Sequence, residues 1–547
     1  MGAGAGGAKN TRTKKRRKNY ITSPFAHLFI SCRAAMSLNT FSFKPLESRK
    51  KIGSLEQINP SVNDPNRVTD LRAAIFNLVS TVVGGGVLSL PFAYATTGIL
   101  LTSVYVGVAA AMAAFSLYIL CSCSRRTGAV TYPEVIRVSF GPGVELAAEF
   151  VLAIFLFFVT TGYMVLIRDI NTGLAQFFVP GAAFVPSKVL LYTLLVCFPC
   201  MLLKSLHSLR FNCYLGFVSV LTLLVSMIYR SYKLCKDSPE RLHSGQVLIY
   251  TDSPYDGFFS FPLVALAFLS QFNMLSVHAS LKDPTRNRLI TVIFWSVLTC
   301  TFIFLLFGTS GYMYALGETK DNILLNFDPN DTVILAGKVG LSVTLMAGIS
   351  MIVLPCRDAV ANLPRKIKNY HNKKKHGSVM RSYGESRPLI ESRNDESFGS
   401  FEKPYEPKIY NDDDEEDIES LGGKSSELDL PRHVLITFGI ATAGYLCACY
   451  CPGVSTVWSI CGSSLGFIIA YILPSACYLK IRGKKKGLNR RVVGAWVMLV
   501  VSILGMTLCS IQAVWRIIGG GVKTRADEFV KDFYNHTTRH HGDQGIF

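Results

Sequence analysis

The sequence predicts an all-α polytopic membrane protein with about eleven transmembrane helices. Apolar runs of about twenty residues, the length needed to cross a bilayer, recur along the chain. Hydrophobic residues make up 50% of the 547 residues, and charged residues only 17%. Lys and Arg gather in alternate connections between the runs, as expected when those connections face the cytoplasm. These observations exclude a soluble globular protein.

Hydropathy places the eleven spans and, with the basic residues, their orientation. The spans cover residues 72–95, 98–121, 146–167, 187–203, 211–229, 258–280, 289–314, 332–356, 432–450, 455–479 and 492–518. Basic inner connections put the N-terminus in the cytoplasm, and an odd number of spans puts the C-terminus outside. Two Asn-x-Thr sequons, at Asn330 and Asn535, then lie on the outer side and are candidate glycosylation sites.

The polar segments complete the domain organisation. We expect a disordered cytoplasmic tail over 1–70, helices one to eight over 71–361, a disordered cytoplasmic insert over 362–431, helices nine to eleven over 432–518, and a short extracytoplasmic tail over 519–547. The net charge is +19, and twelve Lys or Arg lie in the first 51 residues. Such a tail is attracted to anionic lipid. Nucleic-acid binding and an organelle address are the alternatives, and Met36 competes with Met1 as the start.

The insert is basic in its first half and acidic in its second, which carries Asp412 to Asp417 (DDDEED). With few apolar residues it cannot bury a core. A solvated linker is the favoured interpretation, and a regulatory segment is the alternative.

The fifteen cysteines are an odd number, and most lie inside apolar runs, which argues against a disulfide framework. No His or acidic cluster accompanies them, so no metal site is expected. No nucleophile–base pair is recognisable either. We therefore expect neither an enzyme nor a cofactor.

The first span, FNLVSTVVGGGVLSLPFAY over 76–94, contains three consecutive glycines. From Arg72 to Gly84 is about 18 Å along a helix, about half a bilayer core. Glycines at that depth let the backbone unwind, which is tolerated only where protein covers it or a cavity lies beside it. A half-helix starting near Val87 would then point its N–H groups at an anion such as a carboxylate. Close helix packing is the alternative reason for the glycines.

The sixth span carries Ser270, Gln271 and Asn273 around Phe272, again near mid-bilayer. Amides at that depth need partners or a cavity, and a hydrogen-bonded pair between helices is the alternative. The two interruptions open spans one to five and six to ten, which have opposite orientations. This is the pattern of an inverted-repeat transporter. One break would offer N–H groups to a carboxylate and the other would offer carbonyls to an ammonium group, so a zwitterionic amino acid satisfies both.

Five motifs carry a resemblance to a known family. They are FNLVSTVVGGGVLSLPFAY at 76–94, LKSLHSLRF at 203–211, NILLNF at 322–327, LPCRDAV at 354–360 and SICGSSLGFIIAYILPSACYLK at 459–480. The sequence resembles the amino acid/auxin permease family, including protozoan amino acid permeases, over most of 70–518. The resemblance implies a LeuT-like 5+5 inverted repeat plus one extra helix, and secondary active transport by alternating access.

The resemblance also implies the site residues. Gly84, Gly85 and Gly86 would bind the substrate carboxylate, with Ser80 and Thr81 beside them in the unwound stretch. The other substrate-binding candidates are Gln271, Phe272 and Asn273 on the opposite wall and Tyr163 as a cap. Sodium-coupled relatives use an amide in span one and a hydroxyl in span eight. Here Ser80 takes the first position, and Thr344 or Ser350 the second.

Other polar residues inside the spans have two interpretations each. Lys338 either replaces a coupling cation or extends toward the outer surface, and the second is favoured. His278 either relays protons or is simply wetted. Glu145 and Glu149 form a gate pair with Arg137 or Arg210, or face solvent.

We expect a permease for small neutral amino acids, because no acidic residue lies in the middle turns of spans one, three, six, eight or ten to balance a cationic side chain. Coupling to protons is favoured over sodium. The alternatives are a cationic amino acid permease, an amino-acid-sensing transceptor on the same fold, and a channel. The expected partners are the amino acid, the coupling ion and membrane lipid, without nucleic acid, for a monomer in the plasma membrane rather than a vacuole-like organelle.

Overall fold

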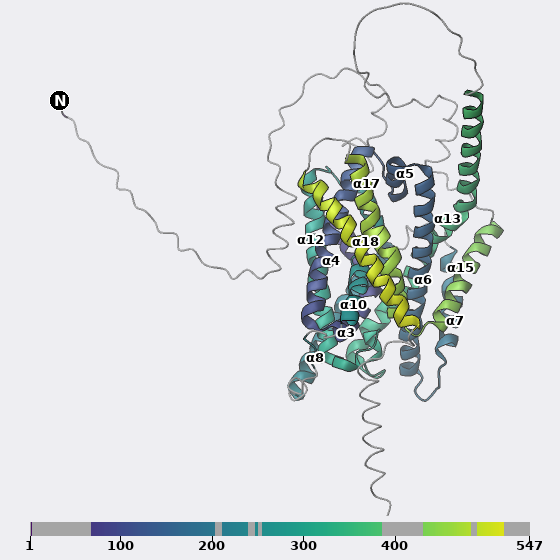
Figure 1. The fold of residues 1–547 in the computed structure, drawn as a ribbon. Coiled ribbons are helices and arrows are strands. Elements are labelled where there is room, and N and C mark those ends of the chain that lie inside the picture. The colour runs from purple at the N-terminus through teal and green to yellow at the C-terminus, as the bar shows by residue number, and fades with distance from the viewer. Residues whose placement is uncertain are drawn as a thin grey trace, which may run out of the picture. The chain divides into compact units, whose positions relative to one another are not determined.

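The computed structural model describes Gly2 and residues 67–202, 210–238, 247–249, 254–384, 430–482 and 489–518. In the described part from Arg67 onward the chain is almost entirely helical, and its long helices run alongside one another (Figure 1). Nine described helices are long and apolar enough to cross a membrane, and the bent pair formed by 71–82 and 85–97 makes a tenth. The predicted all-α multi-pass membrane architecture is confirmed.

Each predicted span has a helical counterpart. The helices are α2 (Leu71–Val82), η1 (Gly85–Ser89), α3 (Leu90–Thr97), α4 (Ile99–Thr127), α5 (Tyr132–Phe140), α6 (Pro142–Phe178), α7 (Pro186–Met201), α8 (Arg210–Asp237), α10 (Pro254–Ala267), α11 (Gln271–Ser280), α12 (Arg286–Ala315), η3 (Leu316–Glu318), η4 (Ile323–Leu325), α13 (Thr332–Gly384), α15 (Leu430–Tyr450), α16 (Val454–Ile460), η6 (Cys461–Gly466), η7 (Ile468–Ile472), α17 (Leu473–Arg482) and α18 (Arg490–Ile518). At 16 residues, α7 is shorter than the other counterparts of the spans.

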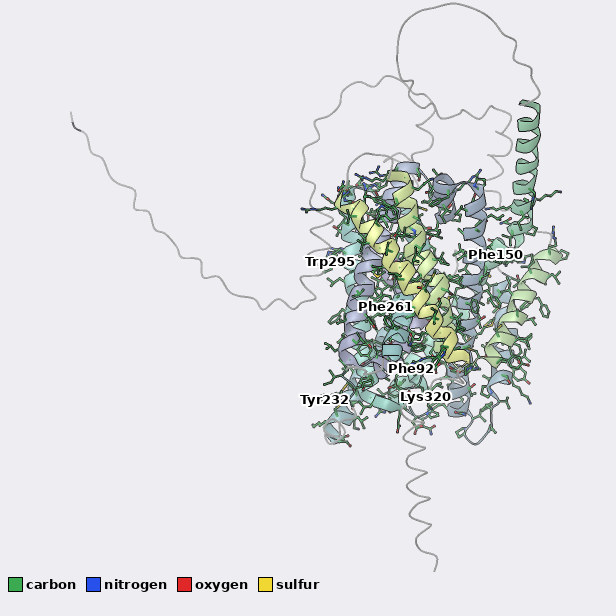
Figure 2. All side chains as sticks on the ribbon, in the orientation of Figure 1. Phe92, Phe150, Tyr232, Phe261, Trp295 and Lys320 are labelled. Carbon is green, nitrogen blue, oxygen red and sulfur yellow. The ribbon has the colours of Figure 1, made fainter. Side chains whose placement is uncertain are left out.

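The bundle has two ends, which we name by the short elements that mark them. The η4 end holds η3 and η4, and α6, α8 and α12 finish there; the α5 end holds α5, and α4 and α17 finish there (Figure 1). Side chains fill the spaces between the helices of the bundle (Figure 2), and α6 and α13 pack along each other. Their close fit is visible at Cys356 of α13, whose Sγ lies 3.8 Å from the Ala153 carbonyl oxygen of α6.

The short helix α5 was not predicted. Its start is a capping box, in which Glu134 N–H donates to Thr131 Oγ1 at 3.4 Å and the Glu134 carboxylate accepts from Thr131 N–H at 3.0 Å. The Tyr132 hydroxyl donates to the Ile469 carbonyl oxygen at 2.7 Å. Burial raises the pKa of Tyr132 well above its usual range, so this hydroxyl keeps its proton.

The Ile469 carbonyl lies in a helical stretch that is wider than an α-helix. Residues 461–466 and 468–472 form π-helix, whose i→i+5 bonds are rare and usually found at functional sites. Hydroxyls from other helices bond carbonyls along it: Ser116 of α4 donates to Ala470 O, and Ser510 of α18 donates to Ser463 O at 3.1 Å. Side chains from three elements, α5 included, therefore support the π-helical stretch.

The eighth span extends further than hydropathy predicted. We expected it to end at residue 356 and a disordered insert to begin at 362, but α13 continues to Gly384. Hydropathy detects only the apolar part of a helix, and the chain beyond Arg365 is rich in lysine. Residues 385–429 of the predicted insert lie outside the described residues, as do residues 1 and 3–66 of the tail and 519–547 with Asn535.

Ion pairs gather at the α5 end. Glu145 of α6 lies 3.7 Å from the Arg137 guanidinium, as predicted for a gate pair. Glu145 also lies 3.7 Å from Lys366 Nζ, and Glu149 forms a closer ion pair with the same ammonium. Lys366 stands on α13, 217 residues from Glu149, so these pairs tie α5, α6 and α13 together.

Candidate functional site

The first break divides the first span in two. The axes of 71–82 and 85–97 meet at a bend of 46°. Gly84 is extended, with φ −134° and ψ −154°, and its carbonyl accepts from Val87 N–H at 3.2 Å. The second half starts at Gly85 as a 3-10 turn and continues into α3. Its first N–H groups have no intrahelical acceptor and are available to an anion. The predicted break is therefore present, and the half-helix starts two residues before Val87.

The second break lies between α10 and α11, at Phe268 to Ser270. Here α10 ends in carbonyls that lack intrahelical donors, apart from Leu266 O, which accepts from Leu269 N–H at 3.0 Å. The two breaks lie side by side, because Asn273 Nδ2, in the first turn of α11, donates to Thr81 Oγ1, in the last turn of α2, at 2.7 Å. N–H groups from one break and carbonyls from the other thus occur at one level of the bundle.

The halves of the two broken helices pack in matching pairs. Toward the η4 end, α3 packs on α10, and Ser260 of α10 donates to Ala93 O at 3.0 Å and bonds the hydroxyls of Thr96 and Thr97. Toward the α5 end, Thr69 N–H donates to Ser280 O at 2.9 Å, beyond the start of α2 and the end of α11. Each side of the site is closed by one half of each broken helix.

Tyr163 of α6 lies against the first break. Its hydroxyl is 3.6 Å from the position of a Cβ on Gly84, and its Cε1 is 3.1 Å from the corresponding position on Gly348 of α13. Two glycines on different helices therefore leave room for this ring. Tyr163, expected to cap the substrate pocket, thus lies beside the first break, whereas Gly348 was not predicted.

The three glycines have different surroundings. A Cβ on Gly85 would lie 2.8 Å from Leu166 Cδ1 and 3.1 Å from Leu345 Cδ2, so Gly85 is a packing position. Gly86 has open space instead, with no described atom within 4 Å of its Cβ position. Close packing therefore accounts for Gly85, whereas Gly86 has free space at its Cβ position.

Two buried polar groups follow the breaks without a partner among the described residues: Gln271 Nε2 and Ser89 Oγ. Gln271 is fully buried, and its Oε1 accepts from Ser270 N–H at 3.0 Å. Leaving a buried donor unpaired costs about 1–3 kcal/mol, so such groups usually await a ligand or water. Ser89 was missed by sequence reasoning, because one serine in an apolar run carries no signal.

The placement of Ser80 and Thr81 differs from the prediction. We expected them in the unwound stretch, but both lie in the last turn of α2, where their hydroxyls donate to Asn77 O at 3.1 and 2.8 Å. These i→i−3 and i→i−4 bonds suit a helical backbone, so the chain unwinds only after Val82. Phe272 is 39% exposed, the least enclosed of the predicted wall residues.

The hydroxyls of the three candidate coupling residues have different surroundings. The Thr344 hydroxyl donates to Gly340 O at 2.8 Å, and its Cγ2 lies 2.6 Å from the Cβ position of Gly216, so this side chain faces α8. Ser350 is buried, and its Oγ has no partner among the described residues. Within the described part of the chain, no hydrogen bond joins Ser80 to either of them.

The structure also shows where three other polar residues discussed above lie. Lys338 is only 5% exposed, so it does not extend to the surface as favoured. His278 is buried at the α5 end of α11, where its carbonyl accepts from Arg67 Nη1 at 3.1 Å. Asn330 is exposed at the η4 end, in the turn before α13. No group of three or more metal-ligating side chains occurs in the described ranges.

A multi-pass helical bundle whose first and sixth spans are broken at one level, with a tyrosine against the first break, is typical of a membrane transport protein. The family model described as transmembrane amino acid transporter protein matches residues 67–515. The chain therefore belongs to the transmembrane amino acid transporter family, which confirms the resemblance drawn from the five motifs.

Individual relatives agree with this assignment. Vacuolar amino acid transporter 5 of Saccharomyces cerevisiae is 24% identical over 78% of this chain and 92% of that protein. Vacuolar amino acid transporter 7 of the same yeast is 26% identical, over 52% of this chain and 58% of that protein. Sodium-coupled neutral amino acid symporter 2 of Danio rerio is 20% identical over 79% of this chain and 80% of its own length. Among solved structures, the nucleobase-cation-symport-1 transporter Mhp1 matches with a TM-score of 0.46 and 11% identity, over 83% of this chain and 94% of that chain.

Proposed function

We propose that the protein is a secondary active transporter, not an enzyme, that carries small neutral amino acids by alternating access. The main support for this proposal is that the two helix breaks lie side by side. The half-helix beginning at Gly85 offers N–H groups to the carboxylate, and the end of α10 offers carbonyls to the ammonium group. Gly86 has free space at its Cβ position, and we propose Tyr163, whose ring lies against the first break, as the cap.

Charge supports a neutral substrate. No acidic residue occurs on α2, η1, α3 or α11. A cationic side chain in the site would therefore have no counter-charge on these elements. We propose Gln271 and Ser89 as further contacts, because each carries a buried polar group without a described partner. Asn273, bonded to Thr81, holds the two broken helices in register.

We propose coupling to protons, because the hydroxyls of the candidate sodium ligands Ser80 and Thr344 each donate to a carbonyl of their own helix. The zebrafish relative is named as sodium-coupled, so sodium is the competing cation. We propose that the α5 end is cytoplasmic and that the protein acts as a monomer in the plasma membrane. The yeast relatives, named as vacuolar, make an organelle the competing location.

Uptake of labelled alanine into proteoliposomes tests the proposal. Wild-type protein should accumulate alanine when the outside is acidic and not when only a sodium gradient is applied. Accumulation that needs sodium and ignores the pH gradient would overturn proton coupling. Absence of transport for every neutral amino acid, by protein that keeps its thermal transition, would overturn the substrate class.

A further inference from the structure

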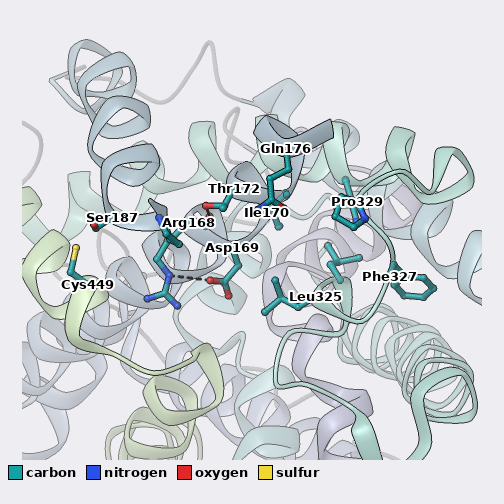
Figure 3. Close-up of a pocket in the computed structure, with 14 residues that line it drawn as sticks. Arg168, Asp169, Ile170, Thr172, Gln176, Ser187, Leu325, Phe327, Pro329 and Cys449 are labelled. Carbon is teal, nitrogen blue, oxygen red and sulfur yellow. Dashed lines mark hydrogen bonds and ion pairs between the residues drawn. The ribbon is translucent and has the colours of Figure 1, made fainter. Parts of the chain in front are cut away.

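A cavity separate from the two breaks lies at the η4 end (Figure 3). Its volume is about 520 Å³, and its lining comes from α6, α7, α13, α15 and the chain from η4 to Pro329. Several polar side chains of α6 line it, among them Asp169, Thr172 and Gln176. This volume exceeds what a small organic molecule needs.

One cation of the lining is already engaged. Arg168 Nε lies 3.0 Å from Asp169 Oδ1, and its Nη1 donates to Ala448 O and Cys451 O at 2.7 and 3.1 Å. These bonds hold the guanidinium against the end of α15, as the dashed contact to Asp169 in Figure 3 shows in part. Arg168 and Asp169 therefore form a neutral, fixed pair in the wall.

The other cation is not engaged. Lys338 of α13 lines the same cavity, is 5% exposed, and has no hydrogen bond or ion pair within the described ranges. The acids whose charges act on it are Asp331 and Asp328, and Asp331 already pairs with Arg230 at 2.5 Å. Burying an ammonium without a partner is costly, so an anion that reaches Lys338 gains a charge-assisted hydrogen bond.

We propose that this cavity binds a small monocarboxylate, with the Lys338 ammonium as its main contact. A single negative charge is favoured over a dianion such as phosphate, because the Lys338 ammonium balances one charge and the other cation of the lining, Arg168, is already paired with Asp169. Thr172 and Gln176 supply further hydrogen-bonding groups. The carboxylate of a free amino acid and that of a simple organic acid share this chemistry.

The element η4 connects the cavity with the surroundings of the first break. Leu324 and Leu325 of η4 line it, and η4 packs against η1, the first turn after the glycine break. A bound carboxylate is therefore in contact with the element that covers the first break from the η4 end.

Binding to the full-length protein tests this directly. The protein in phosphatidylcholine nanodiscs is titrated by calorimetry with butyrate, alanine and inorganic phosphate. Butyrate should bind, and Lys338→Met should weaken it by about tenfold or more, as expected for loss of a hydrogen bond to a charged group. Lys338→Arg should keep the affinity within about threefold, since it keeps the charge. Lys188→Met, an exposed lysine beside the cavity that does not line it, is the matched control.

A second variant distinguishes binding in this cavity from binding at the proposed transport site. Gly86→Val should block the central site and leave butyrate binding unchanged, so failure of the transport proposal does not affect this measurement. Alanine that still binds Gly86→Val, and loses binding with Lys338→Met, supports the amino acid as the source of the carboxylate. Binding of phosphate alone, or butyrate binding that Lys338→Met leaves intact, overturns the proposal, as does absence of butyrate binding to folded wild-type protein.

Discussion

The amide of Asn273 and the hydroxyl of Thr81 meet at 2.7 Å across the two broken helices. Asn273 stands in the first turn of α11, and Thr81 in the last turn of α2, so the bond joins the end of one break to the start of the other. Both side chains were predicted as substrate contacts. Their geometry makes them a clamp between the halves that lie toward the α5 end.

This clamp gives the first prediction. Asn273→Ala and Thr81→Val should each lower the kcat/KM of alanine uptake by about fivefold, as expected for loss of a hydrogen bond of about 1 kcal/mol. The double variant should be no worse than either single variant, because both remove the same bond. Additive losses would mean that each side chain acts separately, for example by touching the substrate.

The open space at Gly86 gives the second prediction. Gly86→Val should abolish uptake while the thermal transition stays within a few degrees of wild type, because the new side chain fills free volume. Gly439→Val on α15 is the matched control, since that Cβ position is also free of neighbours within 4 Å among the described atoms, away from the breaks. Gly85→Val should instead lower thermal stability, because its side chain would overlap Leu166 and Leu345.

Tyr163 gives the third prediction. Tyr163→Phe removes only the hydroxyl near Gly84 and should raise the KM for alanine about fivefold, with the fold unchanged. Tyr163→Ala removes the ring between Gly84 and Gly348 and should destabilise the protein by about 3 kcal/mol or more. If Phe and Ala behave alike in transport and stability, Tyr163 serves packing alone.

Substrate charge is tested by competition. Neutral amino acids should block alanine uptake at concentrations where lysine and arginine do not, because α2, η1, α3 and α11 carry no acidic residue to balance a second ammonium group. Strong competition by arginine or lysine would show that carbonyl oxygens alone stabilise a second ammonium group. Glu149 at the α5 end would then be the first acid to replace.

Orientation is tested by labelling from outside. A membrane-impermeant maleimide should modify Asn330→Cys at the η4 end and not Arg72→Cys at the α5 end, in cells that carry the protein at the surface. Both positions are exposed, so accessibility depends only on the side of the membrane. The reverse pattern would invert the proposed topology.

The sequence predicted the long helices closely, because an apolar run of sufficient length has few alternatives in a membrane. It also predicted both breaks, from the glycines at 84–86 and the amides near 271. It missed α5, although Thr131 and Glu134 carried the capping-box signal. A nine-residue helix was overlooked because it is too short to stand out in hydropathy.

Features that depend on distant pairs were not predictable. Lys366 forms an ion pair with Glu149, which is 217 residues away in the sequence. A single sequence does not show which acidic residue pairs with this lysine. The burial of Lys338 was not predictable either. Its position near the end of the eighth span suggested that it extends to the outer surface, but neighbouring side chains enclose it. The positions of Ser80 and Thr81 were wrong because their hydroxyls can bond within a helix, which delays unwinding by a few residues.

The length of α13 has a consequence for where the helix ends. Its 53 residues span about 80 Å at about 1.5 Å per residue, whereas a bilayer with its headgroups is about 40–45 Å thick. The helix begins at the η4 end, contacts Tyr163 at Gly348, and ends beyond all its neighbours in Figure 1. The helix is therefore about 35 Å longer than the bilayer is thick, so its end at Gly384 lies outside the membrane.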